Sequence, residues 1–190
     1  MKSIRSLILL GSLAASATCL QAADVVFTFD ESADLQPTFS ETVSGITLTL
    51  SNPNSNNGKF AADSEGLLLT SDPSQGPTSF QMSFSSAVQV VGYSLGFVLD
   101  GTTGTFSLDR TGATSSGNDL SSAGDFSING TFTAAGGQTI TLTSNPTGGP
   151  GWSQIKSFTV TPVPEPADFA IVGAALCGAA AFIVRNRKNS

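Results

Sequence analysis

The stretch Phe80–Leu99 reads FQMSFSSAVQVVGYSLGFVL, and its apolar residues recur at every second position. Phe80, Met82 and Phe84 alternate with polar neighbours, and the same period then continues through Val91, Tyr93, Leu95, Phe97 and Leu99. Because successive side chains of a strand point to opposite faces, each set lies on one face of a sheet. The stretch therefore predicts two strands with an apolar face in a core and a polar face in water.

The same alternation extends over residues 24–161. Further sets are Val25/Phe27/Phe29, Ile46/Leu48/Leu50, Phe106/Leu108, Phe126/Ile128, Ile140/Leu142 and Phe158/Val160. Turn-forming clusters separate them at residues 51–58, 71–77, 100–101, 129–130 and 145–151. We expect an all-β fold over residues 23–161, an antiparallel β-sandwich of roughly eight to ten strands, jelly-roll-like or Ig-like. Within it, Phe126–Thr133 resembles a hairpin with a two-residue Asn129-Gly130 turn.

The chain begins with a segment typical of secretory signals. Lys2 and Arg5 precede a short apolar run, and small residues follow it around Ala22 and Ala23. The run is too short to remain in a bilayer as a spanning helix. We expect residues 1–22 to be a signal peptide for the Sec route, cleaved after Ala22, with Ala23 as the alternative.

The other end of the chain predicts one transmembrane helix. Residues 169–184 contain neither a charged residue nor a proline, and a basic tip follows at Arg185, Arg187 and Lys188. A helix of this length is about 24 Å long, somewhat shorter than a hydrocarbon core of about 30 Å. Snorkelling of the basic side chains and local thinning of the bilayer cover the difference. Because Lys and Arg stay on the cytoplasmic side, the C-terminus is expected inside and the body outside.

A proline-rich stretch stands directly before this helix. Val163-Pro164-Glu165-Pro166 is extended, because proline denies it helix and ladder hydrogen bonds. With the helix and the basic tip, residues 162–190 resemble the PEP-CTERM sorting signal of bacteria. That resemblance implies recognition at Pro-Glu-Pro by an exosortase, a membrane-embedded cysteine protease. It also implies transient residence in the inner membrane, followed by delivery to the cell surface or the exopolysaccharide matrix. A plain tail anchor is the alternative.

The body is strongly acidic. Residues 24–166 contain thirteen Asp and Glu against three Lys and Arg, a net charge of −10. This charge argues against nucleic acid as a partner. The chain has no His, and its two Cys lie in the end segments, so catalytic triads and the usual zinc sites are excluded. Five carboxylates near expected strand ends single out no catalytic pair, namely Asp30, Glu31, Asp63, Glu65 and Asp100. We expect no enzyme.

No cofactor is expected, although two groups of carboxylates could supply oxygen ligands for a structural calcium ion. These are Asp24/Asp30/Glu31/Asp34 and Asp100/Asp109. No Asp-x-Asp-x-Asp loop accompanies them, so a solvated acidic surface is the alternative interpretation.

Sugar binding ordinarily uses flat aromatic platforms with nearby amides and carboxylates. The single Tyr, Tyr93, lies on the apolar face of its expected strand, which favours the core. The single Trp, Trp152, follows a glycine-rich loop, where it either contacts a glycan or caps the core. The amides of Asn52, Asn54, Asn56 and Asn57 form a second candidate for glycan contact, or a flexible linker.

Three hypotheses for the body follow. The first is a non-catalytic surface or matrix protein associated with exopolysaccharide. The second is a carbohydrate-binding module with a defined glycan pocket. The third is a hydrolase or lyase that uses carboxylates. The absence of His and the scarcity of aromatic platforms favour the first.

Overall fold

The structure is a computed structural model that describes residues 22–70, 72, 74–149 and 151–164. Of the expected signal peptide, only Ala22 lies within these residues. The later part of the sorting signal lies outside them, namely Glu165, Pro166, the helix 169–184, Arg185, Arg187 and Lys188. Among the helices of the described residues, none combines the length and the apolar character needed to cross a membrane.

The described residues form twelve strands and one short 3-10 helix. The strands are β1 (Val25–Thr28), β2 (Thr38–Val43), β3 (Ile46–Ser51), β4 (Ala62–Asp63), β5 (Gly66–Leu69), β6 (Ser79–Phe84), β7 (Val88–Val98), β8 (Thr103–Arg110), β9 (Ala113–Asp119), β10 (Gly124–Ala134), β11 (Ile140–Gly148) and β12 (Ser153–Pro162). The helix η1 spans Glu31–Ala33.

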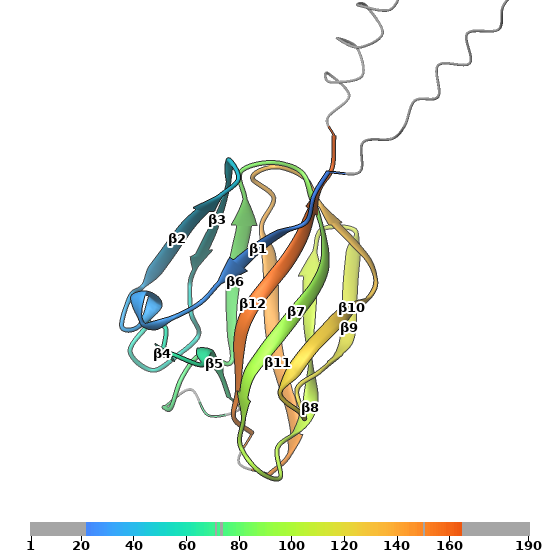
Figure 1. Ribbon diagram of the computed structural model, residues 1–190. Coiled ribbons are helices and arrows are strands. Elements are labelled where there is room, and N and C mark those ends of the chain that lie inside the picture. Colours follow the sequence, from blue (N-terminus) through green and yellow to red (C-terminus); the bar gives the residue numbers. More distant parts are fainter. Residues whose placement is uncertain (1–21, 71, 73, 150, 165–190) are drawn as a thin grey trace, which may run out of the picture.

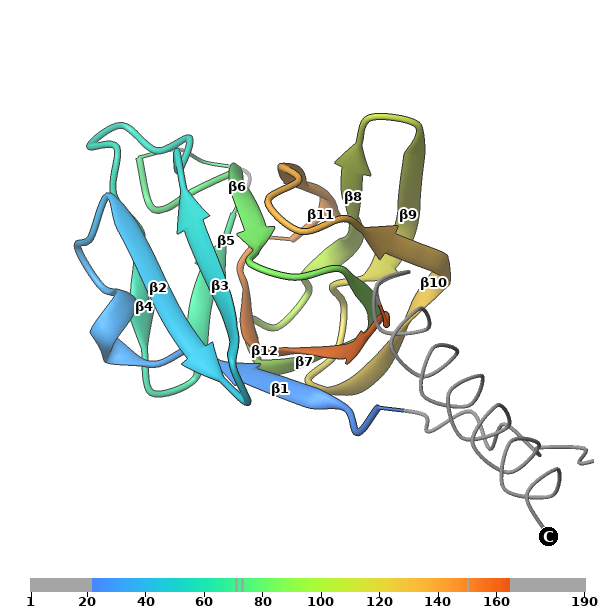
Figure 2. The ribbon, with the colours of Figure 1, turned by 90° about the horizontal axis from the view of Figure 1, so that it is seen from above.

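All strand pairs are antiparallel and belong to two six-stranded sheets. The first sheet has the order β10-β7-β12-β5-β4, and β1 also pairs with β12. The second has the order β2-β3-β6-β11-β8-β9. The β1, β12 and β7 strands lie in front of β6 and β11 in Figure 1, and the same two layers are seen from above in Figure 2. The all-β, antiparallel prediction is confirmed, and the two layers are consistent with the predicted β-sandwich.

One apolar core lies between the sheets and consists of the alternating residues of both. β3 and β6 bury every second residue, as the sequence predicts. At the centre, the ring of Phe158 from the first sheet lies 5.9 Å from Phe29 and 6.4 Å from Phe106 of the second, both edge to face. This tilted arrangement is the one that aromatic quadrupoles favour. With no Cys in residues 24–166, packing of this kind replaces disulfide bonds as the source of stability.

Tyr93 lies in this core, in agreement with its predicted place on the apolar face. Its ring is 4.8 Å from that of Phe106, and its hydroxyl donates a hydrogen bond of 2.8 Å to the carbonyl of Asp119. Burial, helped by the nearby Asp119 carboxylate, raises the pKa of Tyr93 to about 12. The hydroxyl therefore stays neutral and serves the core, which removes Tyr93 as a sugar platform.

The hairpin predicted at Phe126–Thr133 is wrong. Residues 124–127 and 132–134 both pair with β7 in the same direction, so they belong to one strand, β10. The intervening residues 128–131 leave the ladder and contact β9 of the other sheet. Asn129 anchors them: its amide donates to the carbonyl of Gly117 at 2.6 Å, and its carbonyl accepts from Ser115 at 2.7 Å. The Asn-Gly pair forms a bulged excursion because these contacts hold it against β9.

The loop predicted at residues 145–151 is shorter than expected. β11 continues to Gly148, and Asn145 and Pro146 lie opposite Thr105 and Gly104 of β8. A methyl group at Gly104 would lie only 2.4 Å from the Cα of Pro146, so glycine permits this close approach. Sequence composition alone had indicated a turn here.

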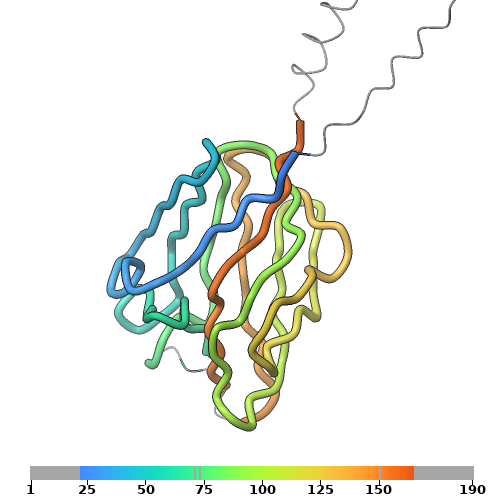
Figure 3. Tube along the Cα trace, in the orientation of Figure 1, coloured from blue at the N-terminus to red at the C-terminus, as the bar shows by residue number. Residues whose placement is uncertain are grey.

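Both ends of the described body lie at one end of the molecule. β1 pairs with the last part of β12, with Val25 opposite Val160. Beyond β12, the Val163 N–H donates to the Ala87 carbonyl at 2.9 Å, whereas Pro164 is exposed. Figure 3 shows the blue start and the orange end of the tube side by side. The body therefore reaches one residue past its predicted end at 161 as strand, and the proline-rich stretch begins directly at its surface.

Replacing Asn118 by Ala should destabilise the contact between β9 and residues 128–131 of β10, which joins the two sheets. Asn118 is 1% exposed, donates to the Phe106 carbonyl at 3.1 Å and accepts from the Asn129 N–H at 2.9 Å. Because both backbone groups lose their partner, we expect the free energy of unfolding to fall by about 2–4 kcal/mol. Urea denaturation followed by circular dichroism measures it. Asn56→Ala, at an exposed position, is the control and should change stability little; equal stabilities of the two variants would contradict the role of this contact.

Candidate functional site

Two β-bulges change the direction of side chains in the middle of the first sheet. Gln154 lies opposite Phe97, and the next pair is Ile155 with Leu95, so Gly96 is an extra residue on β7. One pair further, Lys156 is extra on β12. Leu95 and Ile155 point into the core, whereas Phe97 is turned outward and is 40% exposed. The prediction that Phe97 shares the core face with Leu95 is wrong, because the bulge at Gly96 shifts the alternation by one residue.

The same β7 strand carries a second change of phase. Thr159 lies opposite Gly92 and Val160 opposite Val90, so Val91 is a bulge residue as well. The buried residues upstream are therefore Val88 and Val90 in place of the predicted Val91. Leu99, also predicted for the core face, is partly exposed beyond the end of the strand.

The outward-facing residues form a row across three strands. Gln154 of β12 pairs with Leu68 of β5 on one side and with Phe97 of β7 on the other. Because cross-strand partners share a face, these three side chains lie side by side on the outer surface of the sheet. Trp152, two residues before Gln154, extends the row along the chain.

The turn between β4 and β5 forms one wall beside this row. A methyl group at Gly96 would lie 2.0 Å from the Glu65 carbonyl oxygen, and one at Gly66 would lie 2.3 Å from the Ile155 carbonyl oxygen. The backbone of the turn is therefore in close contact with β7 at Gly96 and with β12 at Gly66. The ammonium of Lys156, the second bulge residue, donates to the carbonyl of Ser64 and fastens the turn from the other side.

Row and turn together enclose a hollow of about 370 Å³ on the outer face of the sheet. We call it the outer hollow, and its lining residues are Asp63, Glu65, Leu68, Phe97, Trp152 and Gln154. The volume lies at the low end of the range of about 300–1,000 Å³ that ligand pockets occupy. Trp152 is half-buried; its N–H donates to the Thr102 hydroxyl at 3.3 Å and its carbonyl accepts from the Leu99 N–H at 3.0 Å. The backbone of Trp152 is thus held at both polar groups.

A polar pair lies at the other side of the outer hollow. The amide of Gln154, which is 8% exposed, donates to Oδ2 of Asp63 at 2.8 Å. Oδ1 of Asp63 accepts from the Glu65 N–H, also at 2.8 Å. Burial raises the pKa of Asp63, but the hydrogen bonds from Gln154 and from the turn outweigh it and hold the pKa below its ordinary value. Asp63 is therefore ionised at neutral pH, the reverse of what a general acid needs.

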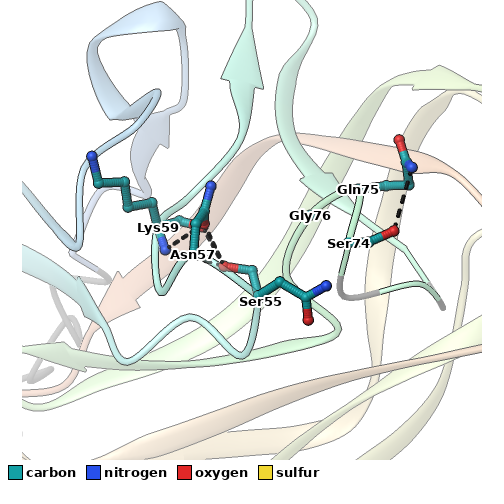
Figure 4. Close-up of a pocket in the computed structure, with 7 residues that line it drawn as sticks. Ser55, Asn57, Lys59, Ser74, Gln75 and Gly76 are labelled. Atoms are coloured by element: carbon teal, nitrogen blue, oxygen red, sulfur yellow. Dashed lines mark hydrogen bonds between the residues drawn. The ribbon is translucent and has the colours of Figure 1, made fainter.

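The asparagine-rich loop forms a smaller hollow of about 170 Å³, drawn in Figure 4. Most of its amides already have partners within the protein. Asn57 accepts from the Ser55 hydroxyl and from the Lys59 N–H, both at 3.0 Å. The amides of Asn52 and Asn54 donate to the side chains of Gln81 and Thr78. These bonds order the loop, and Asn52 and Asn54, which do not line the hollow, bind other side chains of the protein.

The carboxylates considered for calcium are dispersed. Asp24 accepts from the Thr161 hydroxyl at one end of β1, Asp30 caps η1 beyond the other end, and Asp34 accepts from the Ala62 N–H. Asp100 lies before β8, and Asp109 lies within β8 near its other end. Across the ranges 22–70, 72, 74–149 and 151–164, no three acidic side chains converge in an arrangement that could hold a metal ion.

Of the five carboxylates considered for catalysis, the structure brings two into one place. Asp63 and Glu65 both line the outer hollow. Asp30 and Glu31 lie at η1, and Asp100 lies in the turn after β7.

A third hollow, of about 430 Å³, lies where the two ends of the described chain meet and is lined in part by Ile46, Ala87 and Val163.

Comparison with known proteins adds little to this site. No protein-family model matches the chain, and no curated protein does. Three solved chains match it. One is the crystal structure of a Podospora anserina GH26-CBM35 beta-(1,4)-mannanase, with 18% identity and a TM-score of 0.37. The match covers 77% of this chain but 29% of the mannanase chain, so this chain spans less than a third of that protein. A likeness of this size leaves function to be argued from the outer hollow itself.

Gly96→Ala should displace the β4–β5 turn from the sheet. Because the added methyl group would overlap the Glu65 carbonyl, the turn must move, and we expect a loss of stability of about 1–3 kcal/mol. The fluorescence of Trp152, the single Trp, should shift to longer wavelength as the outer hollow opens.

Gly92→Ala is the control on the same strand, since its methyl group would lie 3.0 Å from the Phe126 carbonyl, outside the outer hollow. It should cost stability without moving the emission of Trp152. An unchanged emission in Gly96→Ala would show that the turn does not depend on this contact.

Proposed function

We propose that the β-domain, residues 22–164, is a non-catalytic glycan-binding module whose site is the outer hollow. The observation that carries the proposal is the outward-turned ring of Phe97 beside Trp152, next to the hydrogen-bonded pair Gln154–Asp63. Pyranose rings have apolar C–H faces and polar edges. Aromatic rings stack on the faces, and carboxylates and amides bind the hydroxyls.

The polar pair has hydrogen-bonding capacity left for a ligand. Each carboxylate accepts at about four positions, and the Gln154 amide has two N–H donors, one of which Asp63 uses. Glu65 accepts from the Ser64 hydroxyl at 3.0 Å and keeps further acceptor positions. A sugar hydroxyl both donates and accepts, so it can bridge an acidic oxygen and the amide at once.

The position of the site also supports binding over catalysis. Phe97, Gln154 and Leu68 come from strands, which hold a rigid surface for an extended polymer to lie on. Glycoside hydrolysis needs one carboxyl with a raised pKa, and the lowered pKa of Asp63 does not suit Asp63 to that role. A matrix protein without a defined pocket is the alternative. It would explain the acidic surface but not the outward turn of Phe97, and this difference favours the binding module.

The chain path supports the jelly-roll-like form of the sandwich over the Ig-like form. From β5 to β8 every connection crosses between the two sheets, and the same holds from β9 to β12. Strands that alternate between sheets in this way are typical of jelly rolls, an architecture that also occurs in lectin domains.

Phe97→Ala should weaken glycan binding about tenfold or more, because truncating a central aromatic anchor costs more than 1 kcal/mol. Trp152 fluorescence and isothermal titration calorimetry against soluble exopolysaccharide fragments measure the affinity. Val26→Ala is the control: Val26 is also an exposed apolar residue of the first sheet, 47% exposed, but lies on β1. Equal affinities of both variants and the unchanged protein would exclude the outer hollow as the site.

We further propose that the tail sorts the protein to the cell surface or extracellular matrix through an exosortase. What supports this proposal is the order of the motif at residues 163–166, the apolar run at 169–184 and the basic tip. A processing enzyme must bind one extended segment, and Glu165 between two prolines offers it a charge-assisted hydrogen bond.

Glu165→Ala should leave uncleaved protein in the membrane fraction with a folded β-domain. Losing a charge-assisted bond costs about 1.5–3 kcal/mol, roughly ten- to a hundred-fold in recognition. A plain anchor needs only the apolar run and the basic tip, so it would be unaffected. Fractionation with mass spectrometry of the mature C-terminus tests this, with the exposed Asp125→Ala as control. Normal maturation of the Glu165 variant would leave the tail as an anchor only.

A further inference from the structure

We infer that the outer hollow prefers glycans with a positively charged amino group, such as a polymer of 2-amino sugars, over neutral and anionic glycans. The inference rests on the proposed function and specifies its ligand. It comes from the charges, rings and hydrogen bonds around the outer hollow.

The charged groups that line the outer hollow are both negative. Asp63 and Glu65 are exposed to it, and its remaining lining residues are uncharged. Lys156 of β12 brings one positive charge to the turn, where its ammonium donates to the Ser64 carbonyl; it does not line the hollow, and the two carboxylates outnumber it. A negative site attracts an ammonium group and repels a uronate carboxylate at the same distance.

The carboxylate of Asp63 is held in its charged form. Its two oxygens accept from Gln154 and from the Glu65 N–H, and these bonds favour the ionised state. The negative charge is thus maintained at pH values well below neutrality, where amino groups of sugars are protonated.

The aromatic residues favour the same ligand. The faces of Phe97 and Trp152 carry the negative part of the ring quadrupole and attract cations within about 6 Å, Trp most strongly. A 2-amino sugar has an apolar ring face for stacking and an amino group on the ring edge. It can therefore contact an aromatic ring and a carboxylate of the outer hollow together.

The whole β-domain acts in the same direction. Its residues 22–164 contain twelve Asp and Glu against the basic residues Lys59, Arg110 and Lys156, a net charge of −9. Such a field repels anionic polymers and steers cationic ones toward the surface. A polycationic glycan gains at the hollow and over the rest of the domain.

The test compares two oligosaccharides of equal length with the same β-1,4 backbone, one of glucosamine and one of N-acetylglucosamine. Binding is measured by Trp152 fluorescence and calorimetry at about pH 5.5, between the ordinary pKa values of carboxyls and amines. We expect the glucosamine oligomer to bind about tenfold more tightly, with a preference that falls as salt is added. A uronate oligomer of the same length should not bind measurably.

Asp63→Asn removes the charge but keeps an acceptor for the Glu65 N–H, and the Gln154 amide can turn over so that its oxygen accepts from the new amide. It should weaken binding of the glucosamine oligomer severalfold more than binding of the acetylated oligomer, so the preference for glucosamine falls. Asp24→Asn is the matched control, because it also keeps an acceptor, for the Thr161 hydroxyl, but lies near the chain ends. The control should keep the full preference.

Equal or tighter binding of the acetylated oligomer, or an unchanged preference in Asp63→Asn, would overturn the inference and leave the proposed function intact. A panel of neutral, anionic and cationic glycans that produces neither heat nor a change in Trp152 emission would overturn both.

Discussion

The close contact between the Gly96 bulge and the Glu65 carbonyl is the constraint on which the outer hollow depends. It does two things at once. The extra residue turns Phe97 away from the core, and the missing side chain lets the β4–β5 turn lie directly on the sheet. The neighbouring bulge at Lys156 restores the register between β7 and β12 and binds the same turn through Ser64. Without the bulge, alternation would place Phe97 on the core face, and Gly96 would not be the extra residue that contacts the Glu65 carbonyl.

The core beneath keeps this surface in place without disulfide bonds. Ile155 and Leu95, the pair between the two bulges, are buried, and so are Leu67 and Leu69 on either side of Leu68. At the side of the molecule, the excursion at Asn129 joins β10 to β9 through the buried amide of Asn118. A site made from strands that are fixed in this way loses little conformational freedom when a ligand binds.

Periodicity predicted the strands well and the site poorly, for one physical reason. Alternation reports which residues a strand buries as long as its register is regular, and β3 and β6 are regular. Bulges depend on the partner strand, which a local pattern does not contain. Gly96 within an apolar run is the signal that could have indicated one, since isolated glycines in strands often mark bulges. Gln154 and Leu68 carried no such signal, because only pairing across three strands brings them beside Phe97. The Asn129-Gly130 pair misled for a related reason: its turn geometry is local, but its contacts with β9 are not.

The direction of β12 relates the outer hollow to the ends of the chain. β12 begins beside Trp152 and Gln154 and ends beside β1 and the Val163–Ala87 hydrogen bond, so one strand runs from the candidate site to the exit of the tail. Eight residues of extended chain separate Gln154 from Pro162, about 25 Å. A surface that holds the protein by its C-terminal side would therefore leave the outer hollow at the far end of the sandwich, open to a polymer in solution. The same separation means that the proposed processing at residues 163–166 and the proposed glycan binding at Phe97 would place independent demands on the molecule. An acidic, rigid body with the candidate site away from the proposed tether would satisfy both.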